Sequence, residues 1–219
     1  MGGLGDEDTV LGTERLLLRR WRDADIDVVT RWMADAEFMR HLTGRPATRD
    51  EAVAMFERTR AHWDEHGWGV FAAEERETGE LVGRIGLAYH RAWPGDPECG
   101  WWVAPERQRR GYAREGGAAA VRWGFDVLGF DRLVSIATEA NVASRRVQEL
   151  LGFTLIEQVP FPEQGIELWV HALSRDAVET RGTRRPRRLP RSEPGQPHVR
   201  DQRKLGRQHR RALARARSR

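Results

Sequence analysis

The sequence predicts an α/β protein built around one sheet. Two kinds of apolar pattern share residues 13–179: alternation typical of strands, and the three-to-four spacing typical of helices. They follow one another in the order βααβββαβαββ, and helices that separate the later strands imply layers of helix on sheet. A length of 219 residues fits one such domain with an appendage.

The first half begins with a strand and two helices. Asp23 and Asp25 precede an apolar stripe of helical spacing, and Thr48 with Glu51 forms a capping box that starts the second helix. A turn over 76–80 then joins two strands into a hairpin, because Gly79 tolerates positive φ. The expected elements are a strand over 14–21, a helix with Ile26, Val28, Val29, Trp32 and Met33 on one face, a helix from 48 to about 66, and strands over 68–74 and 81–89.

In the second half, prolines at 94 and 97 predict a break in the chain before the next strand. A helix with Val147, Leu150 and Leu151 at core spacing ends at Gly152. The expected elements are a strand over 98–103, a helix from 112 to about 128, a strand over 132–138, a helix over 142–151, and strands over 153–159 and 166–173.

Charge divides the chain unequally. Residues 180–219 contain 15 of the 37 basic residues and two of the 33 acidic ones, so this tail carries +13 and the rest −9. We expect 1–12 to be disordered, 13–179 to form the domain, and 180–219 to be a disordered Arg-rich tail, because neither end has enough apolar residues for a core. Three interpretations of the tail stay open: an arm that contacts RNA or the ribosome, a counter-charge for the acidic body, or a solvated extension without a role.

The composition and the residue spacing exclude several classes of protein and site. No segment has the roughly 20 apolar residues of a membrane span, and the acidic N-terminus does not resemble a secretory signal. Cys99 is the single cysteine, which predicts a reducing, cytoplasmic location. The seven histidines show no metal-ligand spacing, so we expect no metal.

The strongest local signal is a basic loop before a helix. Backbone N–H groups from Arg109 to Ala113 lie at the helix start, where they have no partner within the helix and favour an anion. Gly111 permits close approach of the backbone. An ordinary solvated loop is the alternative. Gly116 and Gly117 argue against it, because they weaken the helix unless a ligand or the sheet packs closely against them.

Four motifs together resemble the GNAT acetyltransferase superfamily. Residues 108–113 (QRRGYA) are similar to its pyrophosphate loop, and residues 98–103 (ECGWWV) to the strand before that loop. Residues 141–144 (NVAS), followed by LLGF at 150–153, resemble a later block. The opening TERLLLR at 13–19 resembles the branch of the ribosomal-protein-alanine N-acetyltransferases and their relatives.

The resemblance implies a GNAT fold: a mixed central sheet of about seven strands, splayed in the middle, with helices on both faces. Acetyl-CoA would insert at the splay, with its pantetheine arm along the strand that ends at 103 and its pyrophosphate on the basic loop. The implied cofactor-binding residues are Trp102, Val103, Arg109, Arg110, Gly111, Tyr112, Ala113, Asn141 and Ser144. Asn141 is equally suited to cap the helix that follows it.

The implied activity is acetyl transfer to a primary amine by direct attack. The base is Glu98 or Glu163, and Ser144 is the candidate acid for the leaving sulfur. Direct attack needs no nucleophile, so Cys99 is expected to be a small apolar core residue. Many members have a tyrosine where this chain has Gln148. That departure leaves a second function open, a non-catalytic module that binds acyl-CoA.

The acceptor is expected to be a small molecule or a protein N-terminus, and the protein a monomer or homodimer. The acidic body favours a cationic acceptor through long-range steering. Five tryptophans fall on apolar periodicities and are expected in the core, whereas Trp93 is expected to be exposed near the acceptor. The five are Trp21, Trp32, Trp63, Trp68 and Trp123.

Overall fold

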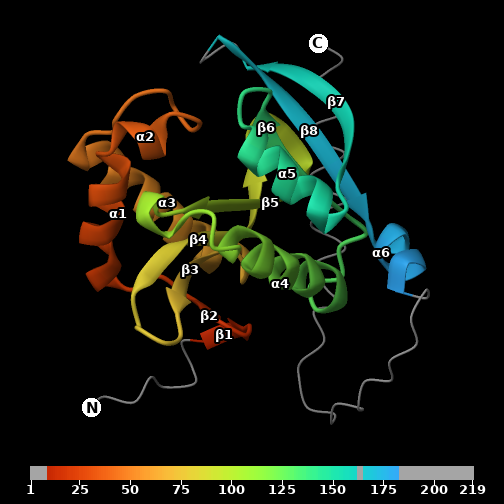
Figure 1. Cartoon of the computed structure of the whole chain (residues 1–219), viewed down its shortest axis with the longest axis horizontal. Coiled ribbons are helices and arrows are strands. Elements are labelled where there is room, and N and C mark those ends of the chain that lie inside the picture. Colours follow the sequence, from red (N-terminus) through yellow and green to blue (C-terminus); the bar gives the residue numbers. More distant parts are fainter. Residues whose placement is uncertain (1–8, 162–164, 183–219) are drawn as a thin grey trace.

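A computed structural model describes residues 9–161 and 165–182, which form one eight-stranded sheet with helices against it (Figure 1). The strand order is β1-β2-β3-β4-β5-β6-β8-β7, and every neighbouring pair is antiparallel except β5 and β6. The strands are β1 Thr9–Gly12, β2 Leu16–Arg19, β3 Val70–Glu75, β4 Leu81–His90, β5 Trp93–Val103, β6 Arg132–Thr138, β7 Thr154–Phe161 and β8 Ile166–Ser174.

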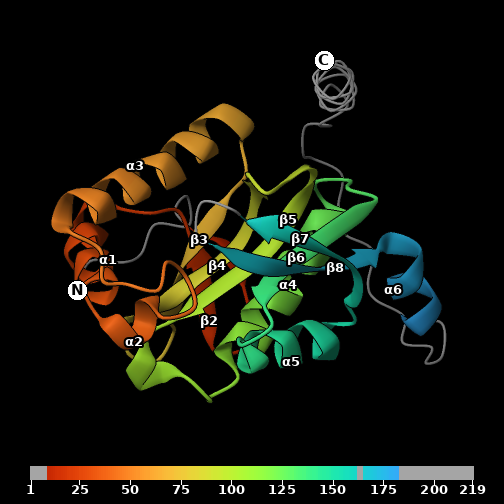
Figure 2. The same ribbon diagram turned by 90° about the horizontal axis from the view of Figure 1, so that it is seen from above.

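The helices cover both faces, as the resemblance to the GNAT superfamily implied (Figure 2). Helices α1, α2 and α3 lie on one face, α4 and α5 lie on the other, and α6 follows β8. Their bounds are α1 Ile26–Met33, α2 Ala36–Met39, α3 Arg49–His66, α4 Tyr112–Asp126, α5 Val142–Leu151 and α6 Arg175–Gly182. Among the described residues, no helix is both long and apolar enough to cross a membrane.

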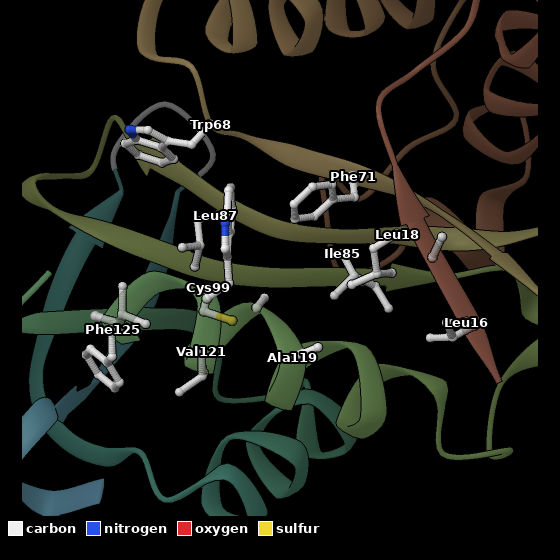
Figure 3. Packing of buried hydrophobic residues seen from close by; sticks show 14 of the residues in the cluster. Leu16, Leu18, Trp68, Phe71, Ile85, Leu87, Cys99, Ala119, Val121 and Phe125 are labelled. Atoms are coloured by element: carbon white, nitrogen blue, oxygen red, sulfur yellow. The ribbon is translucent and has the colours of Figure 1, made fainter. Parts of the chain in front are cut away.

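The two cores follow from strand alternation. Phe71 and Leu87 point from the sheet toward α4, where they meet Val121 and Phe125 (Figure 3). Ala72 points the other way, into a cluster with Trp32 and Phe56 from α1 and α3. All five tryptophans expected in the core are buried.

The sheet is splayed between β5 and β6. Register partners join β6 to β8 along all of β6, from Arg132 to Thr138. In contrast, β5 and β6 share one register pair, Glu98 with Val134. The two parallel strands therefore diverge beyond Glu98, and a gap opens toward their carboxyl ends.

Some boundaries differ from the prediction. Residues 9–12 were expected to be disordered but form β1, which pairs with β2 and brings the strand number to eight. The expected break at 94–97 is instead part of β5, where Pro97 pairs with Tyr89. This stretch precedes the pairing with β6, so its outer edge is free and proline is tolerated there. The tail beyond 182 lies outside the described residues.

Trp93 was expected to be exposed and is not. It is half-buried, packs against the small cluster of Val134, Val170 and Ala172, and its indole N–H donates to Asp96 Oδ2 at 3.3 Å. Because β5 extends back to residue 93, this side chain lies against the sheet rather than at a loop tip.

The paired glycines of α4 allow close packing against protein, not ligand. A Cβ on Gly116 would lie 2.6 Å from Ile85 Cδ1, and one on Gly117 would lie 2.9 Å from Leu151 Cδ1. Both positions are buried. The helix therefore approaches β4 and α5 more closely than any larger residue permits.

Gly116→Ala should lower the thermal midpoint of unfolding. Alanine gains about 1 kcal/mol in helix propensity, but its methyl group would overlap with the fully buried Ile85, and overpacking costs about 1–3 kcal/mol. Differential scanning calorimetry measures the change. The double variant with Ile85→Val, which removes the clashing Cδ1, should regain part of the loss. A higher midpoint for Gly116→Ala alone would contradict this packing.

Candidate active site

The basic loop between β5 and α4 has the conformation of an anion cradle. Arg109 has φ +59° and Gly111 has φ +86°, so the chain enters the left-handed region twice within three residues. Arg109 is the only non-glycine residue with positive φ among those described. Such turns direct successive N–H groups to one side, at the positive end of α4. Arg109, Arg110 and Gly111 are exposed, which leaves the cradle open to a ligand.

An ion pair from a distant segment holds this loop. Arg15, just before β2, donates from Nε to Glu115 Oε2 at 2.8 Å and from Nη1 to the carbonyl of Arg110 at 2.9 Å. Thr13 donates to the same Glu115 carboxylate at 2.6 Å. Because Glu115 lies in the first turn of α4, this network ties the cradle to the sheet.

Tyr112 contributes only its backbone to the cradle. Its side chain is 4% exposed and its hydroxyl donates to Glu75 Oε1. This bond lowers the pKa of Glu75 and raises the pKa of Tyr112. Arg107 also donates to Glu75, at 3.2 Å. The prediction of Tyr112 as a cofactor residue is therefore limited to its N–H, since its ring packs into the core below α4.

Gly111→Val should weaken acetyl-CoA binding. Valine is strained at φ +86°, and its Cβ would come within 3.3 Å of Arg15 Nη2, which shapes the loop. The variant is expected to relieve this strain by leaving the cradle conformation, which then has to be restored on binding. A strain of about 1–3 kcal/mol therefore corresponds to a rise in the Kd for acetyl-CoA of roughly 5- to 150-fold. Isothermal titration with acetyl-CoA measures the Kd. Gly129→Val, at another left-handed glycine beyond α4, is the matched control. Equal Kd values for Gly111→Val and the parent would contradict the assignment.

Glu98 lies at the point where the splay begins. It is half-buried on β5, and its carboxylate lies near the backbone N–H of Ile136 on β6. Burial raises the pKa of Glu98, and the charges of His90 and Arg84 offset part of the rise. A carboxylate with a raised pKa, placed where two strands part, is suited to accept a proton from an amine.

Asn141 and Ser144 form the start of α5, directly after β6. The Asn141 side-chain oxygen accepts from the N–H of Ser144 at 3.1 Å, so the helix-cap interpretation is confirmed. The cap uses Oδ1 and leaves the Asn141 amide N–H groups as donors for a ligand. Ser144 is half-buried, one turn into the helix.

Trp102 and Val103 lie on the diverging end of β5. They pair on one side with Arg84 and Gly83 of β4, which leaves their other side toward the gap. Gln108 from the basic loop donates to the Val103 carbonyl at 3.2 Å. The loop and the diverging strand are thus joined by a side chain of the predicted motif.

A cleft of about 760 Å³ opens at the carboxyl end of β6. One wall is the segment after α2, with Arg40 and His41, and the opposite wall is formed by Glu139 and by Glu167 and Trp169 of β8. Burial and the neighbouring Arg40 lower the pKa of His41. The cleft adjoins Asn141 in sequence, so it leads toward the start of α5.

Three further predictions concern single residues. Cys99 is fully buried in the α4 core, and burial raises the pKa of its thiol, as expected of an apolar core residue. Gln148 is also fully buried and donates to Ser135 Oγ at 3.1 Å, so it supports β6 rather than facing a ligand. Glu163 lies outside the described residues. Among those described, no group of three or more His, Cys, Asp or Glu side chains is placed to hold a metal.

Comparison with known proteins agrees with this geometry. The model of the acetyltransferase (GNAT) domain family matches residues 15–154. An uncharacterised N-acetyltransferase of Bacillus subtilis, YoaA, is 30% identical over 148 residues, which cover 66% of this chain and 82% of that protein.

Solved structures show the same fold. An acetyltransferase from Agrobacterium tumefaciens superposes with a TM-score of 0.68 at 29% identity, over 80% of this chain and 99% of that one. A spermidine N-acetyltransferase from Vibrio cholerae, in complex with CoA and spermine, superposes with a TM-score of 0.62 at 17% identity, over 74% and 97%. The fold is therefore the one that the motifs implied. The sequence left open an enzyme or a non-catalytic binding module, and the matched family supports the enzyme. This chain belongs to the GNAT acetyltransferases.

Proposed function

We propose that this protein transfers the acetyl group of acetyl-CoA to the nitrogen of a primary amine by direct attack. The observation that carries the proposal is the half-buried Glu98 carboxylate at the start of the splay, on the strand that leads to the anion cradle. The same fold accommodates CoA in the spermidine acetyltransferase from Vibrio cholerae. Acetyl-CoA supplies an activated thioester, and this chain supplies the binding groups, a base and a hydrogen-bond donor.

The cradle and α5 would hold the co-substrate. Backbone N–H groups from Arg109 to Ala113 are suited to bind the pyrophosphate, with the exposed Arg109 and Arg110 adding charge. The amide donors of Asn141, which the helix cap does not use, are suited to bind a carbonyl of the pantetheine arm. The side of Trp102 and Val103 that faces the gap would pair with the same arm.

Two side chains would carry the proton transfers. Glu98 accepts a proton from the attacking amine, directly or through a water molecule. The Ser144 hydroxyl donates a hydrogen bond to the leaving sulfur. Gln148, at the position of the usual tyrosine, has no labile proton and is committed to Ser135, so it does not take this role. Glu163 remains the alternative base.

Thiol release measured with acetyl-CoA and a panel of primary amines tests the proposal. The expected result is CoA production that depends on the amine, with a matching N-acetylated product by mass spectrometry. Tight acetyl-CoA binding without turnover of any amine in the panel would overturn it.

A further inference from the structure

Arg84, on the face of the sheet that meets α1 to α3, forms no salt bridge with any described residue. It lies on β4 opposite Trp102, and its guanidinium carbon is 4.3 Å from the centroid of the Trp102 ring. Its Nε atom is buried and makes no hydrogen bond with the described residues. Burial lowers the pKa of Arg84 to about 10, and the charge of Glu98 is the only one that opposes this effect. Arg84 is therefore still charged at neutral pH.

Arg84 as a whole is half-buried, whereas Arg19, which is buried on the same face, is fully paired. Arg19 donates to Glu74 at 2.7 Å and to both carboxylate oxygens of Asp25, at 2.8 and 3.0 Å. A buried polar atom without a partner is costly, and among the described residues the buried Nε of Arg84 has none. The contrast indicates that Arg84 is kept for a partner that the chain itself does not supply.

Arg84 lines a small cavity between the sheet and α1 to α3. The cavity has a volume of about 10 Å³, the room of about one water molecule. Its other walls are mostly aromatic or apolar: Trp21, Val29, Trp32, Met33, Phe38, Met55, Phe56, Thr59 and Trp102. The cavity therefore holds at most one water-sized group, and a larger group could reach Arg84 only if these side chains moved. Arg84 is the one charged side chain among the lining residues.

Arg84 and Glu98 face the same side of the sheet. Arg84 pairs with Trp102, and Glu98 is four residues earlier on β5, an even number, so the three side chains share one face. A cation and a carboxylate with no hydrogen bond between them thus lie on the same face of the sheet. A ligand that carries both a carboxylate and an amine complements this arrangement.

We propose that the acceptor is a compound with both a primary amine and a carboxylate, of the amino-acid class, whose carboxylate binds Arg84 while its amine faces Glu98. This inference rests on the proposed function and names its substrate class. It departs from the cationic acceptor that the net charge of the body favours. Net charge acts on diffusion over long distances, whereas Arg84 acts at contact, where it would repel a polycation.

The wild-type protein provides the first test. Each amino acid is compared with the amine that lacks its carboxylate: phenylalanine with phenethylamine, leucine with 3-methylbutylamine, and methionine with 3-(methylthio)propylamine. Spermidine represents the polycations. The expected result is a kcat/KM roughly 10- to 100-fold higher for the carboxylated member of at least one pair, the range typical of a hydrogen-bonded charge. Equal or better transfer to the plain amines or to spermidine would overturn the inference while leaving the proposed function intact.

Arg84→Met provides the second test. It should abolish the preference for the carboxylated member and leave the KM for acetyl-CoA within about twofold, whereas Arg84→Lys should retain part of the preference. Arg58→Met, on the exposed face of α3, makes the same change of charge and should alter neither. An equal loss with both members of a pair would contradict a role in recognition. If Arg84→Met does not fold, Arg84→Lys and the wild-type ratios decide. No transfer to any amine would refute the proposed function itself.

Discussion

Glu98→Gln should reduce kcat/KM for the amine by roughly 10²- to 10⁴-fold, the usual contribution of a general base. Glutamine retains the shape of the side chain and keeps a carbonyl oxygen near the Ile136 N–H, so the splay should keep its geometry. What it loses is the ability to accept a proton. Steady-state thiol release, with the Kd for acetyl-CoA measured in parallel, separates this loss from a binding defect.

The pH dependence of kcat/KM tests whether Glu98 is the base. Burial raises the pKa of Glu98, so the carboxylate becomes protonated, and activity is lost, as pH falls through a value above that of an ordinary glutamate. The parent should show this acid limb in kcat/KM, and Glu98→Gln should lack it. Glu57→Gln, exposed on α3, should retain it. An unchanged limb in Glu98→Gln would assign the base to another group, with Glu163 the first to examine.

Ser144→Ala should lower kcat by up to roughly 10²-fold while the Kd for acetyl-CoA changes little. The hydroxyl is removed, but the backbone N–H of Ser144 still donates to Asn141, so the start of α5 is preserved. Asn141→Ala should show the opposite balance, with weaker acetyl-CoA binding and lower stability from the lost cap. Rapid-quench and titration measurements distinguish the two. A Ser144→Ala enzyme with the parent kcat would exclude the hydroxyl from the departure of the sulfur.

Local signals explain why so much of the fold was predictable. The capping box at Thr48 marks the start of α3, and the left-handed Gly152 marks the end of α5. Each of these signals acts within one helical turn. The cradle was predictable for the same reason, since the basic residues, Gly111 and the start of α4 are contiguous.

Contacts between distant segments explain what was missed. Arg15 and Glu115 are 100 residues apart, and nothing near either one indicates that they hold the cradle together. Arg84 is one position in an alternating strand, and only the register with Trp102 reveals that it faces an aromatic cavity. The prolines at 94 and 97 predict a break, but a strand tolerates proline where no neighbouring strand needs its N–H. Local sequence does not show which strand lies beside them.

The divergence of β5 from β6 gives the protein two additional sheet edges in its interior. Rows of backbone donors and acceptors without a neighbouring strand invite pairing with another chain, which is how edge strands promote aggregation. Natural sheets discourage such pairing with a charge that points inward from the edge, and Glu98 supplies one where β5 leaves β6. The carboxylate that would take a proton in the reaction thus also opposes closure of the gap and its occupation by a foreign strand.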